Sequence, residues 1–460
     1  MAVELIFVFM MVAFVLGVFL LKLPIGLALV LASVVGALSG GEGFPLRHLV
    51  EGQFGYLDSI LIIASAMVFM KVILHSGLLD TIARKIIDHL HDKPVMLLLS
   101  MMAVIMFPGM ITGSSTAAVL TTGALVAPVL IGMGIPREKT AAIIALGAIY
   151  GMVAPPVNIP VMIIGGGIDM PYVGFGLPLL LASVPLAVTV VILIGYQYVR
   201  KVDLSKIGDR LPTSFGEAHG LKIYLPVVVL IVLMLGEKVL PGRFPSLGLS
   251  LIFLIAAVVG AFTGRKLNFF KVALEAVHDA LPVMGILMGV GMFIQIMTLT
   301  GVRGMLVIFC LALPSLFLYL GIATSMPLFG AISSYGSASV LGVPFVLALL
   351  GQNEIMTASG LSLIAGLGDL MPPTALAGIF AAQIVGVENY FKVLKYCIWP
   401  AVLTAVYGIV LILNANAFMK LFDDLQGSLI VLAVFVGYIL LIVLLARLGV
   451  KLWGKEETTC

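Results

Sequence analysis

The chain has 460 residues, of which 62% are hydrophobic and 10% are charged, and its formal net charge at pH 7 is +3. Soluble domains carry about 25% charged residues, and the mean hydropathy here is +1.23, so a water-soluble globular protein is excluded. Apolar runs recur along the whole chain, each long enough to cross a hydrocarbon core of about 30 Å. The composition therefore predicts an all-α polytopic membrane protein.

Taken in chain order, the apolar runs predict eleven spans, at 5–21, 24–40, 57–74, 140–168, 176–199, 222–240, 246–263, 274–298, 355–386, 396–418 and 427–449. The first run has no cationic start and no small-residue cleavage site, so we expect no cleaved signal peptide. Residues 78–92 place apolar side chains on one helical face and charges on the other. This pattern predicts a helix that lies on the membrane surface.

Two further apolar stretches, 95–131 and 304–350, are interrupted by glycine and serine. Each is either a pair of spanning helices or a re-entrant hairpin. Lys93 precedes the first stretch, and Arg137 and Lys139 follow it. Cytoplasmic loops collect Lys and Arg, and a hairpin leaves all three cations on one side. With both stretches as hairpins, most of the 25 Lys and Arg residues fall on one face, which predicts the N-terminus outside and the C-terminus in the cytoplasm.

These elements predict six segments. They are the first scaffold spans and surface helix (1–92), the first hairpin, broken helix and following span (93–199), a cytoplasmic loop (200–221), the second scaffold spans (222–303), the second hairpin, broken helix and following span (304–418), and an extra C-terminal span with its tail (419–460).

The two halves resemble each other. Gly113-Ser-Ser-Thr116 has a counterpart in Gly336-Ser-Ala-Ser339, Ala154-Pro-Pro156 in Met371-Pro-Pro373, and Ser76-Gly77-Leu78 in Thr300-Gly301-Val302. The predicted topology starts the halves on opposite sides of the membrane, so the repeats are inverted. Inverted repeats with broken helices in matching positions are typical of secondary transporters whose site lies at the midplane.

The breaks suggest the chemistry of this site. A broken helix exposes unpaired N–H groups, which attract anions, and unpaired C=O groups, which together with hydroxyl oxygens suit a hard cation such as Na⁺. We expect the cation at Gly113, Ser114, Ser115, Thr116, Asn158, Gly336, Ser337, Ser339, Gly368, Asp369 and Thr374. We expect the substrate at Ser115, Ala154, Pro155, Pro156, Asn158, Ser339, Pro372 and Pro373. Small hydroxyl residues that only let helices pack closely are the alternative.

Asp369 is an acidic residue near the middle of a predicted span, three positions before Pro372. A charge at that depth costs several kcal/mol unless it is paired or hydrated, so the residue is a functional candidate. It is a Na⁺ ligand, a proton-titrating group or a protonated structural carboxyl. No His or Lys lies beside it or Ser115 in the sequence, so we expect no enzyme, no cofactor and no transition-metal site.

The first half carries a family resemblance through Pro108, Gly113-Ser-Ser-Thr-Ala-Ala, Pro128, Gly132-Met-Gly134, Ala154-Pro-Pro156 and Gly176-Leu-Pro178. Over residues 5–418 the chain resembles the large membrane subunit of TRAP transporters. The resemblance implies an elevator-type transporter of the ion transporter superfamily, with a moving domain of two re-entrant hairpins and two discontinuous helices. In the second half, Gly330-Ala-Ile-Ser-Ser-Tyr-Gly-Ser-Ala-Ser339 replaces the Asp-Pro-Thr-Ala pattern usual in the family, and Asp369 replaces an apolar residue.

The resemblance also implies function and partners. It implies Na⁺-coupled import of a carboxylated organic anion across the bacterial inner membrane, with a periplasmic substrate-binding protein and a small four-helix membrane subunit. Two alternatives remain open at this point. One is a stand-alone carrier of the same superfamily, coupled to Na⁺ or to protons through Asp369, and the other is a channel.

Overall fold

The computed structural model describes residues 2–199, 215, 219–239 and 243–422, and a few single positions between 433 and 444. These residues form helices, turns and loops, with no strand among them. The predicted loop 200–221 and the predicted span 427–449 lie largely outside the described residues. An all-helical protein is confirmed.

The first half begins with α1 (Val3–Phe19), α2 (Ile25–Gly40), α3 (Leu46–Phe54), α4 (Leu57–Ser76) and α5 (Leu78–Leu90). Next come α6 (Pro94–Thr112), α7 (Ser115–Ala118), a π-helical turn η1 (Val119–Gly123) and α8 (Ala124–Gly132). The half ends with α9 (Arg137–Val153), α10 (Ile159–Gly167) and α11 (Gly176–Val199). A helix within the predicted segment 78–92 and the predicted break at 154–158 are therefore present.

The second half repeats much of this order. It contains η3 (Gly220–Tyr224), α13 (Leu225–Val239), α14 (Gly248–Thr263), α15 (Phe269–Leu299) and α16 (Val302–Ala312). There follow α17 (Ser315–Gly330), α18 (Ser334–Ser337), a π-helical turn η4 (Ala338–Gly342) and α19 (Val343–Ala348). The last described helices are α20 (Glu354–Gly366), η5 (Leu367–Leu370), α21 (Leu376–Ile384), α22 (Tyr390–Leu413) and α23 (Ala415–Phe422).

Two elements differ from the sequence-based prediction. The stretch 304–350 is not one hairpin, because α16 ends at Ala312 and a separate helix starts after Pro314. α16 follows Gly301 just as α5 follows Gly77, and both glycines adopt positive φ, at +77° and +78°. The short helix α3 was also not predicted. Its nine residues, interrupted by charged side chains, produce no long apolar run.

Six helices of the described residues are long and apolar enough to cross a membrane alone: Leu57–Ser76, Pro94–Thr112, Ser115–Gly132, Gly176–Val199, Phe269–Leu299 and Tyr390–Leu413. The helices α1 and α2, expected to be full spans, are apolar but have 17 and 16 residues, which is short for a core of about 30 Å at 1.5 Å per residue. The exposed faces of α1, α14 and α22 are rich in large apolar side chains, as expected of lipid-facing helices.

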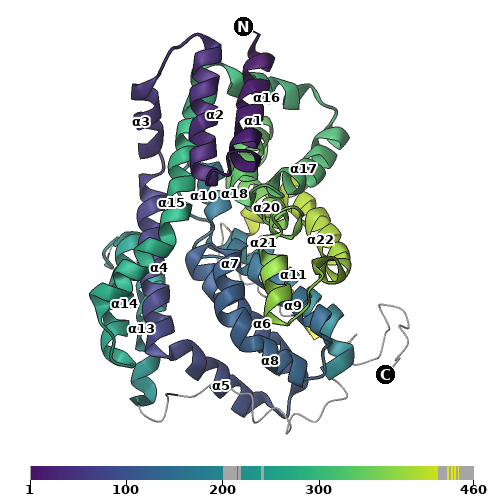
Figure 1. Ribbon diagram of the computed structural model, residues 1–460. Coiled ribbons are helices and arrows are strands. Elements are labelled where there is room, and N and C mark those ends of the chain that lie inside the picture. Colours follow the sequence, from purple (N-terminus) through teal and green to yellow (C-terminus); the bar gives the residue numbers. More distant parts are fainter. Residues whose placement is uncertain are drawn as a thin grey trace.

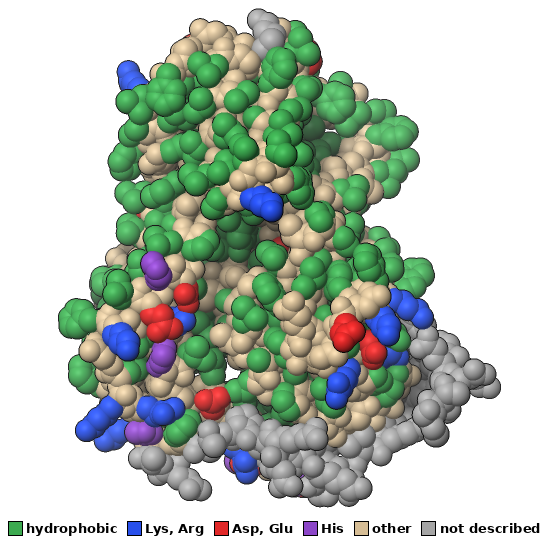
Figure 2. Space-filling model, in the orientation of Figure 1, with side chains coloured by type: hydrophobic (Ala, Val, Ile, Leu, Met, Phe, Trp, Pro, Cys, Tyr) green, Lys and Arg blue, Asp and Glu red, His purple; other side chains and the backbone are tan. Residues whose placement is uncertain are grey.

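The helices form two groups (Figure 1). α1–α4 pack with α13–α15, while α6–α11 pack with α20–α22. α5 runs along the lower edge of the molecule from one group to the other. On the face in Figure 2, charged side chains gather mainly over the lower part, and the surface is hollowed near mid-height. We call α1–α4 and α13–α15 the first helix group, and α6–α11 together with α17–α22 the second.

The first helix group is held together by close glycine crossings. A Cβ on Gly26 of α2 would lie 2.3 Å from the carbonyl oxygen of Gly285 on α15. A Cβ on Gly291 of α15 would lie 2.0 Å from the carbonyl oxygen of Gly52 on α3. Small residues let membrane helices approach to backbone contact. Dispersion forces at such contacts stabilise helix association, because the hydrophobic effect does not act between helices in lipid. An ion pair adds to these contacts. Near the C-terminal end of α4, the Lys71 ammonium group lies 2.7 Å from the Glu275 carboxylate and 2.6 Å from the Asp279 carboxylate of α15.

The substitution Gly291→Ala tests the crossing between Gly291 of α15 and Gly52 of α3. It is expected to destabilise the protein by about 1–3 kcal/mol, because the added methyl group overlaps backbone that has no room to move. Gly285→Ala on the same helix is the matched control, since a Cβ there meets nothing within 4 Å. Thermal unfolding in detergent compares them, and equal midpoints for the two variants would show that the crossing does not limit stability.

Candidate functional site

Both hairpins turn at a serine that caps the following helix. In the first, Gly113 adopts φ +65° and the hydroxyl of Ser114 accepts from the backbone N–H of Ala117 at 3.2 Å. In the second, the hydroxyl of Ser333 accepts from the N–H of Gly336 at 3.1 Å. A serine at this position satisfies an N–H group that the helix itself leaves unpaired. Ser114 and Ser333 therefore mark the tips of the two hairpins.

The second tip lies four residues before the predicted one, because Ser333 and not Ser337 corresponds to Ser114. Gly336, Ser337 and Ser339 are in the first turns of the returning arm, where the Ser337 hydroxyl donates to the Met326 carbonyl at 2.7 Å and the Ser339 hydroxyl to the Gly336 carbonyl at 2.9 Å. The feature shared by the tips is the pair Ser-Ser, at 114–115 and 333–334. That repeated pair was the signal available in the sequence.

Each hairpin packs on a broken helix through two glycines. A Cβ on Gly109 of α6 would lie 2.8 Å from the carbonyl carbon of Gly151 on α9. A Cβ on Gly368 of η5 would lie 2.5 Å from the Cα of Gly330 on α17. Gly109 and Gly330 stand near the ends of the hairpins' first arms. The contact thus brings each tip beside the break of its own half.

The backbone at each break bonds to the neighbouring hairpin. Both breaks contain a cis Pro-Pro bond, at Pro155–Pro156 and Pro372–Pro373. After the first, the N–H of Val157 donates to the Met110 carbonyl at 3.1 Å. After the second, the hydroxyl of Thr374 donates to the Ala331 carbonyl at 2.7 Å. These bonds satisfy polar groups that would otherwise be unpaired at membrane depth.

The side chain of Asp369 lies where the two tips meet. It is 7% exposed, its carboxyl group accepts a hydrogen bond from the hydroxyl of Ser115 in the first hairpin, and it lies beside Ser334 of the second. Next to it, the hydroxyl of Tyr335 donates to the Gly113 carbonyl at 3.0 Å and so joins the tips directly. Ser334 and Tyr335 were not among the predicted site residues.

Asp369 makes no salt bridge among the described residues. Neutral hydroxyl groups do not offset the cost of burying an ionised carboxylate, so the group requires a proton or a bound cation. The nearby oxygens are hydroxyls and backbone carbonyls, which suit a proton or a hard cation. The described residues contain no group of three or more His, Cys, Asp or Glu that could hold a metal ion.

The side chain of Asn158 forms hydrogen bonds to both sides of the first break. Its amide group donates to the Val153 carbonyl at 2.8 Å and to the Ser362 hydroxyl at 3.0 Å, and its oxygen accepts from the Val161 N–H at 2.9 Å. It thereby links the end of α9, the start of α10 and the facing helix α20. Ala375, at the corresponding place in the second break, adopts φ +37° and offers no such side chain.

The remaining predicted residues lie around this centre. Ala154, Pro155 and Pro156 form the first break and Pro372 and Pro373 the second, while Gly368 precedes Asp369 and contacts Gly330. Thr116 is half-buried in α7. The structure therefore brings Gly113, Ser114, Ser115, Asp369 and Thr374 to the tips and breaks, and places Gly336, Ser337 and Ser339 along the second hairpin.

Asn158→Asp tests the amide bridge. The carboxylate keeps the acceptor for Val161 but loses both donors and faces the Val153 carbonyl, so we expect a loss of about 1–3 kcal/mol in stability. Asn268→Asp is the control, because Asn268 caps α15 with its oxygen alone, accepting from the Lys271 N–H, and a carboxylate is favourable there. Thermal midpoints in detergent decide, and similar values for both variants would contradict the role of the two amide donors.

Known proteins share this architecture. The Neisseria gonorrhoeae protein MtrF, whose structure is described as illuminating a class of antimetabolite efflux pumps, matches with a TM-score of 0.57 and 14% identity, over 80% of this chain and 83% of that chain. The YdaH transporter of Alcanivorax borkumensis matches with a TM-score of 0.55 and 17% identity, over 80% of this chain and 88% of that chain. At these identities the likeness concerns the fold alone.

Among curated proteins, the Malate-2H(+)/Na(+)-lactate antiporter of Bacillus subtilis (strain 168) is 27% identical over 267 residues. The match covers 54% of this chain and 54% of that protein, so the chain spans about half the length of this relative. The family model of the DctM component of tripartite ATP-independent periplasmic transporters matches residues 7–418. Because this match covers most of the chain, the protein is a membrane transporter that belongs to the DctM family.

Proposed function

We propose that the chain is the transport subunit of a Na⁺-coupled importer of a carboxylated organic anion. The observation that carries the proposal is the buried carboxyl group of Asp369, which bonds to Ser115 of one hairpin and lies beside Ser334 of the other. A cation bound there would join both tips, so its presence is coupled to the arrangement of the hairpins. Family membership supports a periplasmic substrate-binding protein and a small membrane subunit as partners.

The proposed cation site uses oxygen ligands from both halves. The Asp369 carboxylate, the Ser115 hydroxyl and the Gly113 carbonyl already stand at the meeting of the tips. Hard cations prefer such oxygens. The organic anion is proposed to lie beside the cation, against the backbone of Pro155–Asn158 and Pro372–Thr374, where the helices α10 and α21 begin and their N-terminal dipoles favour negative charge.

The proposed movement is an elevator motion of the second helix group, with its two hairpins and two broken helices, past the first. The two groups contact each other at Tyr56. The hydroxyl of Tyr56, before α4, donates to the Ile163 carbonyl of α10 at 2.8 Å, and its ring packs where a Cβ on Gly166 would lie 2.7 Å away. The side with α5 is proposed to face the cytoplasm, the N-terminus to be outside and the membrane to be the bacterial inner membrane.

A second candidate is a stand-alone carrier coupled to protons through Asp369. It is favoured by the absence of a salt bridge to Asp369 among the described residues, since a proton neutralises the carboxylate as well as Na⁺ does. The name of the relative from Bacillus subtilis includes both H⁺ and Na⁺. Under this candidate the binding protein and the small subunit are not required.

Uptake into proteoliposomes separates the candidates. With a substrate-binding protein and a small membrane subunit present, an inward Na⁺ gradient is expected to drive uptake. Asp369→Asn is expected to lower the rate of uptake at least tenfold, because the neutral amide holds a cation poorly. Asp58→Asn, an exposed acidic residue at the start of α4, is the control. Uptake that ignores Na⁺, follows an inward proton gradient without partner proteins and disappears in Asp369→Asn would establish the second candidate instead.

A further inference from the structure

Both Pro-Pro breaks receive a tyrosine hydroxyl from the segment that follows the broken helix. Tyr172 comes after α10, and Tyr390 is the first residue of α22, after α21. Each hydroxyl reaches back to the unwound backbone of its own half. Neither tyrosine belongs to the set of oxygens expected to hold the cation or the substrate, and neither is explained by packing alone.

Tyr172 bridges the two sides of the first break. Its hydroxyl donates to the Pro156 carbonyl at 3.0 Å and accepts from the Asn158 N–H at 3.1 Å. The ring stacks on Phe175, with centroids 5.3 Å apart and an interplanar angle of 13°. One hydroxyl therefore satisfies both a carbonyl and an N–H that the interrupted helix leaves without partners.

Tyr390 holds the second break beside Asp369. Its hydroxyl donates to the Leu370 carbonyl at 2.5 Å, and Leu370 follows Asp369 directly. The ring lies against α21, where a Cβ on Gly378 would be 2.2 Å from a ring carbon. The glycine is therefore needed for this tyrosine to reach the break. Through Leu370, the hydroxyl restricts the backbone that carries the central carboxyl group.

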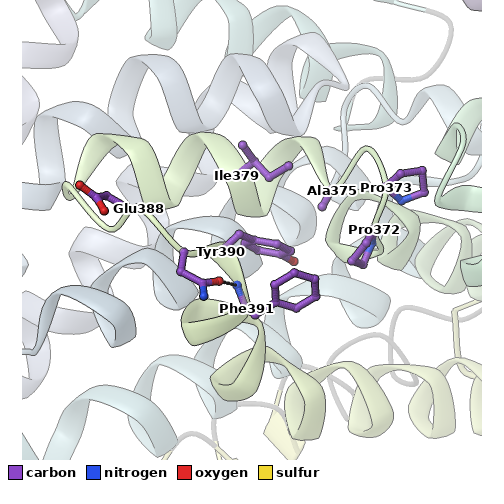
Figure 3. A pocket seen from close by; sticks show the side chains of 8 residues that line it. Pro372, Pro373, Ala375, Ile379, Glu388, Tyr390 and Phe391 are labelled. Carbon is purple, nitrogen blue, oxygen red and sulfur yellow. Dashed lines mark hydrogen bonds between the residues drawn. The ribbon is translucent and has the colours of Figure 1, made fainter.

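A cavity of about 530 Å³ lies beside the second break, on the side where Tyr390 packs. Figure 3 shows Pro372 and Pro373 at one end of its lining, and Tyr390 and Phe391 between them and Glu388. The break is thus not enclosed by close packing on this side, and Tyr390 both lines the cavity and bonds to the Leu370 carbonyl. A hydrogen bond that fixes the backbone is more important beside an open cavity than in a close-packed core.

We propose that Tyr172 and Tyr390 are a pair of positioning residues, one in each half, whose hydroxyls keep the unwound backbone in the geometry that binds the coupling cation. The inference rests on the proposed function, since it assumes a cation at Asp369. A carbonyl oxygen has two lone pairs. A tyrosine that occupies one of them fixes the orientation of the peptide group, so less ordering is required when the cation binds.

The experiment uses Tyr390→Phe and Tyr172→Phe, which remove the hydroxyl and keep the ring. The complete transporter is reconstituted, and initial uptake is measured across a range of Na⁺ concentrations. We expect Tyr390→Phe to raise the half-saturating Na⁺ concentration about two- to tenfold, the effect of one lost hydrogen bond, with the maximal rate nearly unchanged. For Tyr172→Phe we expect a smaller rise, because its break lacks the carboxyl group.

Tyr407→Phe is the matched control. The Tyr407 hydroxyl also donates to a backbone carbonyl, that of Leu181 at 2.8 Å, but away from both breaks. It loses the same kind of bond and must leave the Na⁺ dependence at the wild-type value. A second measurement, the rise in thermal midpoint on adding Na⁺ to detergent-purified protein, reports cation binding without transport and must require more Na⁺ in Tyr390→Phe.

The inference is overturned if Tyr390→Phe lowers the thermal midpoint but leaves the Na⁺ dependence unchanged, or if Tyr407→Phe shifts it equally. Both outcomes would make the hydroxyl merely structural. Failure of the proposed function looks different, because wild-type uptake would then ignore Na⁺. If it follows pH instead, the same variants decide the inference through the pH of half-maximal uptake, which must move in Tyr390→Phe and not in Tyr407→Phe.

Discussion

Unwound backbone inside a membrane must find its hydrogen-bond partners within the protein, and the rest of this structure depends on that constraint. Each Pro-Pro break frees carbonyl and N–H groups from the hydrogen bonds of a continuous helix. The partners come from three directions: the neighbouring hairpin, the facing helix and the tyrosine that follows the broken helix. A region that would otherwise be a defect in a helix thereby becomes an ordered polar centre in apolar surroundings.

This centre needs close approach between helices, and glycine provides it. The pairs Gly109–Gly151 and Gly330–Gly368 bring each hairpin to backbone contact with its broken helix. Larger residues at these crossings would move the tips away from the breaks and separate Ser115 and Ser334 from Asp369. Small residues here position polar groups, in addition to packing helices together. The geometry of the site and the packing of the fold therefore depend on the same residues.

The sequence predicted the main features of the fold because their causes are local. Apolar runs indicate membrane helices, Pro-Pro removes donors whatever surrounds it, and Gly77 and Gly301 adopt the positive φ that their type permits. The prediction for the second tip was wrong by four residues, because the halves were matched on a glycine instead of on the Ser-Ser pair at the start of each returning arm. α16 was merged with the second hairpin, since its residues are apolar like those of α17 and its end at Ala312 is not evident in the sequence.

The sequence by itself determined that this is a helical membrane protein with two apolar stretches interrupted by glycine and serine, two breaks at Pro-Pro and an acidic residue at a break, since each of these follows from residue types at short range. Only the tertiary structure decided that Asp369 meets Ser115 and Ser334, that Tyr335 joins the tips, and that Tyr172 and Tyr390 close the breaks. These contacts join residues as far as 254 positions apart. Their existence depends on which helices cross at glycine, and no local pattern encodes that choice.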